Sequence, residues 1–200
     1  MTTRERVERA ADSIIRKEGV EKLTMRRLAQ EADVALKTPY NLFGSKTGVL
    51  IALLDRATAA LVEELLADTS ALVLAQTFNA LSTLERFYTA DEAYFRMIVW
   101  AVMTSEHQEE RTAAHANIIN LVSAKVIEAR AAKELRAPTD VTLLGEQLGL
   151  NLLANLGSWA GGHLSMQDTI RHTTTVWRAL LVPHMTKRSR LALTESLELS

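Results

Sequence analysis

Residues 23–50 read LTMRRLAQEADVALKTPYNLFGSKTGVL, and this stretch decides how the chain begins to fold. Thr24 is a residue type that caps helix N-termini, and apolar residues follow it at helical spacing up to about Glu31. The next three residues, 32–34, include an Asp, which enters the left-handed backbone region more readily than most residues. The pattern predicts a short helix, a tight turn and a second helix that ends near Phe43.

Pro39 lies inside the second of these helices. Proline lacks a backbone N–H and clashes with the carbonyl four residues earlier, so it disturbs a helix that begins at Ala35. Proline is favoured at the first helical position, and Thr38 before it can act as the cap. We therefore predict that this helix starts late or has a distorted first turn.

The remainder of the chain also has helical periodicity, and only three prolines and eight glycines interrupt it. An apolar stripe from Val7 to Ile15 ends near Gly19, and Ser45 is a suitable N-cap for a long helix after it. Further helices are predicted at about 71–88, 92–105, 109–134, 140–160 and 166–185. No alternating pattern indicates a sheet, so the predicted fold class is all-α.

The composition excludes several classes of protein. The chain has 200 residues, 48% of them apolar, which is enough for a core, and it has no cysteine for disulfides or thiolate metal sites. Its first residues are charged where a secretory leader is apolar. Its most apolar stretch, 148–156, is far shorter than the roughly 20 residues of a membrane helix. We expect a cytoplasmic protein that does not enter a membrane and has neither a metal nor a cofactor.

Charge is distributed unevenly along the chain. Residues 1–50 hold ten Lys and Arg against seven Asp and Glu, whereas the other 150 residues hold thirteen against seventeen. Because local charge governs local binding, a basic beginning on an acidic remainder favours contact with phosphates near the N-terminus.

In combination, these residues resemble the N-terminal signature of the TetR (tetracycline-repressor) family of transcriptional regulators. That signature has a Thr-initiated helix, a Leu-Ala pair, a turn, a Thr-x-Tyr-x-x-Phe segment, and Ser-Lys at the start of a long helix. The matching residues are Thr24, Leu28, Ala29, Ala32, Val34, Thr38, Tyr40, Phe43, Ser45 and Lys46. The resemblance covers roughly residues 5–55. The departures are Asp33 at the turn glycine, Ala35 at the usual serine cap, Lys37 at a position that is often small, and Pro39.

The resemblance implies a three-helix helix-turn-helix DNA-binding domain, residues 1–46, which we call the head. Residues 47–200 are then a helical domain for ligand binding and dimerisation. Such a protein binds a palindromic operator in double-stranded DNA as a homodimer, typically as a repressor, and a small, largely apolar effector releases it.

Eight residues of the head are candidates for DNA contact: Thr24, Arg26, Arg27, Lys37, Thr38, Tyr40, Asn41 and Lys46. Asn can hold adenine with two hydrogen bonds and Lys can reach guanine, so Lys37, Thr38 and Asn41 are the candidates for base edges. The others are candidates for phosphates. Arg27 has an alternative role, which is an ion pair with a nearby acidic residue.

Around the helix at 140–160, apolar residues cover almost the whole circumference, so it needs cover on two sides. A second copy of the chain can supply one side, and a central position in a monomer is the alternative. Gly145-x-x-x-Gly149 and Gly157-x-x-x-Gly161 allow close approach of another helix. The candidate dimer-interface residues are Leu148, Leu152, Trp159, Trp177 and Leu181.

Large apolar residues and a few polar ones in the C-terminal domain are candidates for an effector site. They are Phe78, Phe95, Trp100, Met103, His107, His115, Asn151 and Asn155. Each apolar member is equally compatible with an ordinary core. An Asn in an apolar helix needs a partner, which a ligand, neighbouring backbone or a dimer mate can supply.

Two other classes of function compete with a DNA-binding regulator. The chain has no phosphate-binding glycine loop, no HExxH and no GxSxG, and no His follows a Glu at the spacing of a di-iron site, so nothing favours an enzyme. A helical protein-interaction module is the other alternative, and Pro39 and Ala35 favour it. A regulator that has lost its ligand response is a further alternative.

Overall fold

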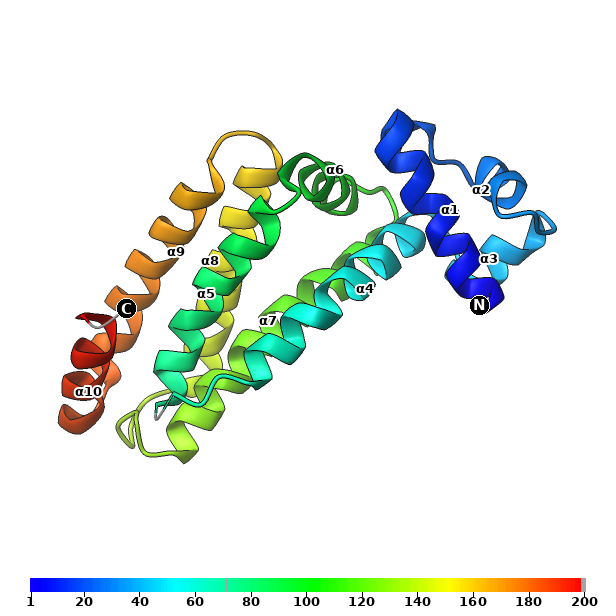
Figure 1. Ribbon diagram of the computed structural model, residues 1–200. Coiled ribbons are helices and arrows are strands. Elements are labelled where there is room, and N and C mark those ends of the chain that lie inside the picture. The colour runs from blue at the N-terminus through cyan, green and yellow to red at the C-terminus, as the bar shows by residue number, and fades with distance from the viewer. Residues whose placement is uncertain (71, 199–200) are drawn as a thin grey trace. The chain divides into compact units, whose positions relative to one another are not determined.

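The computed structural model describes residues 1–70 and 72–198, and these residues are helical almost throughout (Figure 1). The helices are α1 Thr3–Glu18, η1 Val20–Lys22, α2 Met25–Glu31, α3 Lys37–Phe43, α4 Lys46–Leu66, α5 Val73–Thr89, α6 Glu92–Met103, α7 Gln108–Ala131, α8 Val141–Ala160, α9 Met166–Leu181, η2 Val182–His184 and α10 Lys187–Glu198. Within the described residues there is no strand, only an isolated bridge between Leu135 and Met185. The predicted all-α class is confirmed.

Each helix predicted from the sequence is present, with bounds that shift by a few residues. The predicted start at residue 71 lies outside the described residues. Helix α10 was not predicted from the sequence, because Pro183 interrupts the helical pattern before it and few of its described side chains are buried. Among the described side chains of α10, only Ser189 and Leu193 are buried.

By its internal contacts the chain divides into two compact units. Unit 1 comprises residues 1–60 and 91–114, and unit 2 comprises residues 61–90 and those from 115 onward. Helices α4 and α7 are each shared between the two units. The domain boundary proposed at residue 46 stays a prediction.

The core of unit 1 forms where the apolar stripe of α1 meets the helices that follow it. Packing joins α1 to α2 and α2 to α3. The side chains of Val7, Ile14, Leu28, Val49 and Leu53 are at most 2% exposed. Since burial of a large aliphatic side chain contributes about 1.5–3 kcal/mol, this cluster holds the short helices α2 and α3 in place.

Unit 2 is organised around α9, which packs on both α8 and α5 (Figure 1). Trp177 is buried, its ring meets Phe78 edge-on at 6.4 Å between centroids, and its Nε1 donates to the carbonyl of Leu148 at 3.0 Å. Trp159 is buried against Tyr88, with 5.0 Å between ring centroids. The two tryptophans thus anchor α8 and α9 inside one chain.

Two glycines of α8 bring it close to α7. A Cβ on Gly145 would lie 2.7 Å from the Cα of Ser123, and a Cβ on Gly149 would lie 2.7 Å from the Cα of Ile119. Because real Cβ atoms do not come so close, only glycine fits at both positions. The prediction that this glycine pair allows close helix approach is confirmed, and α7 of the same chain is the neighbouring helix.

Glu134 is a buried acidic residue that stabilises the beginning of α5. Its Oε1 accepts from the amide of Val73 at 2.7 Å and its Oε2 from the amide of Leu74 at 3.0 Å. The N-cap of α5, Leu72, has no side chain that can do this. Glu134 therefore caps α5 from a distant part of the chain.

None of the described helices is both long enough and apolar enough to span a membrane.

Candidate nucleic-acid interface

The first helix of the predicted pair is formed as its residues indicate. The Oγ1 of Thr24 accepts from the amide of Arg27 at 3.2 Å, so Thr24 caps α2. Asp33 has a φ of 50° in the turn that follows. The amide of Val34 then donates to the carbonyl of Ala29 at 3.0 Å. The predicted cap and the left-handed turn are both confirmed.

The recognition helix α3 starts at Lys37, two residues later than Ala35. The expected late start is confirmed, but the prediction that Thr38 caps the helix ahead of Pro39 is wrong. Pro39 is the third helical residue, where an amide has no intrahelical acceptor, so its missing N–H costs no bond. The carbonyl of Ala35 lies outside the helix and accepts from the amide of Thr38 at 2.8 Å.

One side of α3 is exposed and the other is buried. Lys37, Tyr40 and Asn41 share the exposed side at the i, i+3, i+4 spacing of one helical face, and Tyr40 is 50% exposed. Pro39 and Phe43 are buried on the opposite side. Thr38 is half-buried between the two faces. Three of the predicted contact residues of α3 therefore point to solvent together.

Arg4 of α1 holds the end of α3 in position. Its guanidinium lies 4.6 Å from the centre of the Phe43 ring and donates to the carbonyl of Leu42 at 3.4 Å. Its Nε also donates to Glu8 at 3.0 Å, and Glu8 is buried. A cation over an aromatic face is attractive, so this contact orients the recognition helix on α1.

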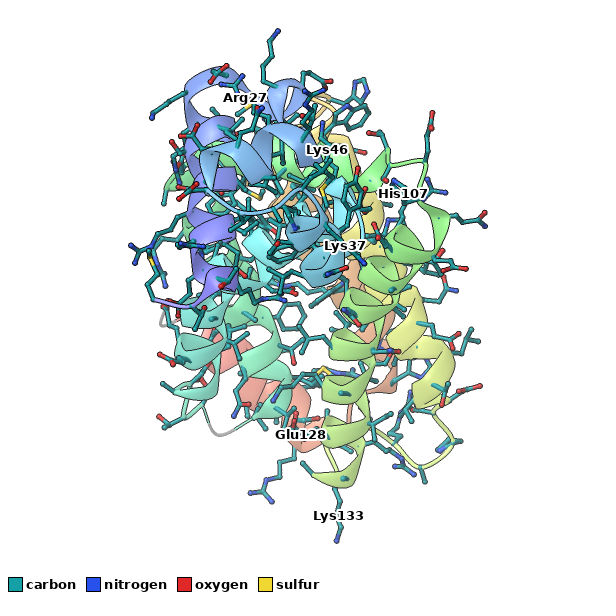
Figure 2. The ribbon with its side chains drawn as sticks, turned by 90° about the vertical axis from the view of Figure 1, so that its right-hand side faces the viewer. Arg27, Lys37, Lys46, His107, Glu128 and Lys133 are labelled. Atoms are coloured by element: carbon teal, nitrogen blue, oxygen red, sulfur yellow. The ribbon has the colours of Figure 1, made fainter. Side chains whose placement is uncertain are left out.

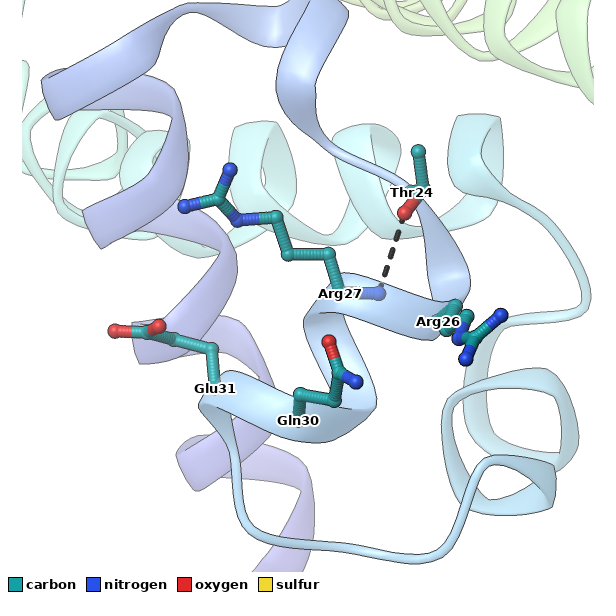
Figure 3. Close-up of a pocket in the computed structure, with 5 residues that line it drawn as sticks. All are labelled: Thr24, Arg26, Arg27, Gln30 and Glu31. Carbon is teal, nitrogen blue, oxygen red and sulfur yellow. Dashed lines mark hydrogen bonds between the residues drawn. The ribbon is translucent and has the colours of Figure 1, made fainter.

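A hollow of about 540 Å³ lies over α2 (Figure 3). It is lined by Thr24, Arg26, Arg27, Gln30 and Glu31. Figure 3 shows the side chains of Arg26 and Arg27 pointing to different sides of the helix. Sequence reasoning singled out the first three residues but missed Gln30 and Glu31, which carry no motif signal.

The two arginines of α2 have different surroundings. Arg27 donates to Glu18 with both terminal nitrogens, and the bond from its Nη1 to Oε2 is 2.7 Å long. Arg26 is exposed, and the described ion pairs do not include it. The alternative role proposed for Arg27, an ion pair with a nearby acidic residue, is the one that the structure contains. Arg26 is the guanidinium of α2 that is available to an external anion.

The beginning of α4 adds a third set of donors. Ser45 caps the helix, because its Oγ accepts from the amide of Gly48 at 3.1 Å. Lys46 is the first helical residue and is half-buried. Figure 2 labels Lys46 together with Arg27 and Lys37, all three in unit 1. The geometry thus combines an exposed reading helix with cationic groups from the helices before and after it, as in a helix-turn-helix module that contacts DNA.

A family model described as "Bacterial regulatory proteins, tetR family" matches residues 9–53. These residues include α2, the turn and α3. The resemblance of the head to the TetR family is confirmed over these residues. The match favours a transcriptional regulator that binds DNA over the alternatives. A search of the curated proteins finds no match.

Several solved structures share the fold over nearly the full chain. FadR of Thermus thermophilus, a transcriptional repressor in complex with lauroyl-CoA, superposes with a TM-score of 0.71 and 21% identity, covering 89% of this chain and 93% of that one. The SmeT–triclosan complex superposes with a TM-score of 0.67 and 19% identity, covering 94% of this chain and 93% of that one. The fatty acid degradation regulator FadR of Bacillus halodurans superposes with a TM-score of 0.62 and 18% identity, covering 90% of this chain and 95% of that one.

The candidate effector residues are divided between the two units. Phe95, Trp100, Met103 and His107 belong to unit 1, and Phe78, His115, Asn151 and Asn155 belong to unit 2. Phe78 and Phe95 are buried, whereas Trp100 and His107 are exposed.

The polar candidate residues of unit 2 differ in whether their side chains have hydrogen-bond partners. Asn155 donates to the Oγ1 of Thr173 at 3.0 Å. The Oδ1 of Asn151 is buried and has no hydrogen-bond partner among the described residues, and the same is true of the Oγ of Ser123. Sequence reasoning missed Ser123, a single serine in a helix.

All five candidate dimer-interface residues are buried within the single chain, at most 7% exposed. The large apolar side chains that α8 and α9 do expose are Leu143, Leu150, Val176 and Leu180.

Among the described residues, no group of three or more His, Asp or Glu side chains is placed to hold a metal ion.

Proposed function

We propose that this regulator binds a palindromic operator as a homodimer, acts as a repressor, and is released by a small, largely apolar effector. The observation that carries the proposal is the exposed face of α3, where Lys37, Tyr40 and Asn41 lie together at helical spacing. Such a face is what a recognition helix presents to the major groove.

Each exposed group has a role that suits its chemistry. Asn41 binds adenine and Lys37 binds guanine, and the half-buried Thr38 lies at the edge of the same face. The hydroxyl of Tyr40 and the guanidinium of Arg26 bind phosphates. Thr24 and Lys46 are further phosphate ligands, because each lies at the start of a helix, where the helix dipole favours anions.

Exposed apolar side chains on α8 and α9 support dimerisation. Leu143 and Leu150 are 53% and 46% exposed at i, i+7 spacing, and Val176 and Leu180 are each 36% exposed at i, i+4 spacing. A second copy of the same two helices can cover them. The buried residues beneath, Trp159 and Trp177 among them, then give the interface a rigid support.

Two buried polar atoms of unit 2 support an effector site. Ser123 Oγ and Asn151 Oδ1 have no partner among the described residues, and a buried polar atom without a partner costs about 1–3 kcal/mol. A ligand with an apolar body and one or two polar groups can satisfy them. Two proteins with this fold have been solved in complex with lauroyl-CoA and with triclosan.

Selection of bound duplexes from fragmented genomic DNA, followed by a salt titration on the selected sequence, tests the function. We expect a palindromic sequence whose two half-sites are about one helical turn apart, and two chains per duplex. The logarithm of the binding constant falls linearly with the logarithm of salt concentration, by about 0.9 for each phosphate contacted. A protein that ignores every duplex at low salt is an interaction module instead.

Adding apolar compounds, such as long-chain acyl-CoAs and phenols, to the complex tests the effector. We expect at least one class to raise the unfolding temperature and to release the duplex. A protein that binds the selected duplex but responds to none of them is a regulator without ligand response.

A further inference from the structure

A carboxylate of the protein itself, that of Glu110, lies at the N-terminus of α4. The Oγ of Ser45 donates to the Oε2 of Glu110 at 2.5 Å. A Cβ built on Gly44 would lie 3.6 Å from Glu110 Oε1, and one on Gly48 would lie 3.7 Å from it. The carboxylate of Glu110, from the first turn of α7, therefore rests against the first turn of α4.

The first turn of α4 would also attract a phosphate of bound DNA. The first amides of α4, those of Lys46 and Thr47, have no intrahelical acceptor, and the dipole of a 21-residue helix favours an anion there. The ammonium group of Lys46 adds a positive charge. This step rests on the proposed DNA contact at Lys46.

Glu110 is held in this position by the turn that precedes it. The hydroxyls of Thr47 and Ser105 are 2.6 Å apart, so the turn between α6 and α7 is bonded to α4. The guanidinium of Arg111 in turn donates to the carbonyl of Ser105. These contacts fix the first turn of α7 beside α4, and Glu110 with it.

Capping of α4 does not require Glu110. Ser45 alone accepts from the amide of Gly48 at 3.1 Å, which satisfies the usual capping bond. The carboxylate is therefore an additional anion at a helix end that already has its cap.

We propose that Glu110 is an internal competitor for the phosphate at the start of α4, an autoinhibitory contact that weakens DNA binding. A carboxylate and a phosphate repel each other at one helix end, so DNA must turn the carboxylate away before a phosphate occupies the place. The cost of this step lowers the affinity for every duplex, without regard to sequence.

The test compares Glu110→Gln with Glu109→Gln by fluorescence anisotropy on the selected duplex over a range of salt concentrations. The Gln at 110 keeps the shape and can still accept from Ser45. Glu109 lies in the same helical turn and carries the same charge, but it is exposed and takes part in none of the described hydrogen bonds or ion pairs. Circular dichroism checks that both variants fold.

We expect Glu110→Gln to bind about three- to tenfold more tightly at low salt, the size expected for two like charges about 4 Å apart in water. Its salt dependence should steepen, because the bound duplex no longer meets the negative charge of the carboxylate. Glu109→Gln should change the affinity less than twofold. Equal or weaker binding by Glu110→Gln, or an equal gain from both variants, overturns the proposal.

Glu110→Asp separates position from charge, since it keeps the carboxylate but shortens its reach to α4. We expect tighter binding than the unchanged protein, and affinity equal to that of the unchanged protein contradicts the proposal. If the unchanged protein binds no duplex and Glu110→Gln does, autoinhibition is supported. If neither binds, both the proposed function and this inference fail, whereas binding by the unchanged protein without a gain in Glu110→Gln removes only the inference.

Discussion

Gly149 of α8 faces Ile119 of α7 so closely that a Cβ on the glycine would lie 2.7 Å from the isoleucine Cα. The two backbones are thus in contact, and α8 depends on α7 as well as on α9. A helix that is apolar around most of its circumference is in this way covered on two sides within one chain.

Gly149→Ala should destabilise the protein by about 1–3 kcal/mol, because the added methyl group overpacks the contact with α7. In an open helix the same change stabilises, by about 0.4–1 kcal/mol, so the sign of the effect reports the close approach. Urea unfolding measures the change in the free energy of unfolding, with Gln147→Ala on the exposed side of α8 as the control. A stabilised Gly149→Ala would show that the helices move apart at little cost.

Glu134→Ala should remove about 3 kcal/mol of stability, because the amides of Val73 and Leu74 lose a charged acceptor in a site that is 4% exposed. For a chain of this size the unfolding temperature should fall by about 6–12 °C. Glu128→Ala is the matched control, since Glu128 is 52% exposed and its ion pair with Lys125 lies at the surface. Equal effects of the two changes would contradict the capping role of Glu134.

Arg26→Ala and Arg27→Ala should affect DNA binding differently. Loss of a phosphate contact at Arg26 should reduce the salt slope by about 0.9 on any duplex. Arg27 is already paired with Glu18, so its removal should leave the slope unchanged. A salt titration of DNA binding by both variants measures these slopes. An equal reduction of the slope in both would mean that the Arg27–Glu18 pair opens when DNA binds.

Asn41→Ala should lose discrimination at one base position, worth about 1–3 kcal/mol, and bind random duplex as before. Tyr40→Phe should weaken binding to specific and random duplex alike, because a phosphate contact carries no sequence information. Competition assays with single-base variants of the operator measure both. Equal losses on specific and random duplex for Asn41→Ala would remove its reading role.

Tyr88 should make unit 2 sensitive to alkaline pH. Burial raises the pKa of its phenol to about 12, above the value of about 10 in an unfolded chain. The folded state therefore favours the neutral phenol, and this stability is complete below pH 10 and lost as the pH rises toward 12. Two pKa units correspond to about 3 kcal/mol.

Denaturant unfolding between pH 9 and pH 12 measures this loss, and Tyr88→Phe should lose less stability over the same range. Burial also raises the pKa of Tyr94, but Tyr94 is present in both proteins, so the difference between them isolates Tyr88. Parallel curves would show that Tyr88 does not control the alkaline transition.

Local features of the head could be predicted from the sequence because each depends on residues within one turn. Thr24 caps its own helix through Arg27, Asp33 adopts the left-handed turn, and Ser45 caps α4 through Gly48. Pro39 also had a local effect, a late start of α3, although the cap residue expected from it was wrong.

The partners of charged residues could not be predicted in this way. Glu18 pairs with Arg27, Glu110 with Ser45, and Glu134 with amides that precede it by about 60 residues. A charged side chain in a sequence has many possible partners, and which one it meets depends on how distant helices pack.

The sequence by itself determined that the chain is helical, where most helices begin and end, and that residues 24–46 form two short helices joined by a tight turn, because periodicity and capping operate over three or four residues. The tertiary structure alone decided which arginine of α2 remains available, which apolar residues of α8 and α9 stay exposed, and that a carboxylate rests at the start of α4. These outcomes depend on contacts between helices far apart in the chain, and close packing, rather than local preference, selects such contacts.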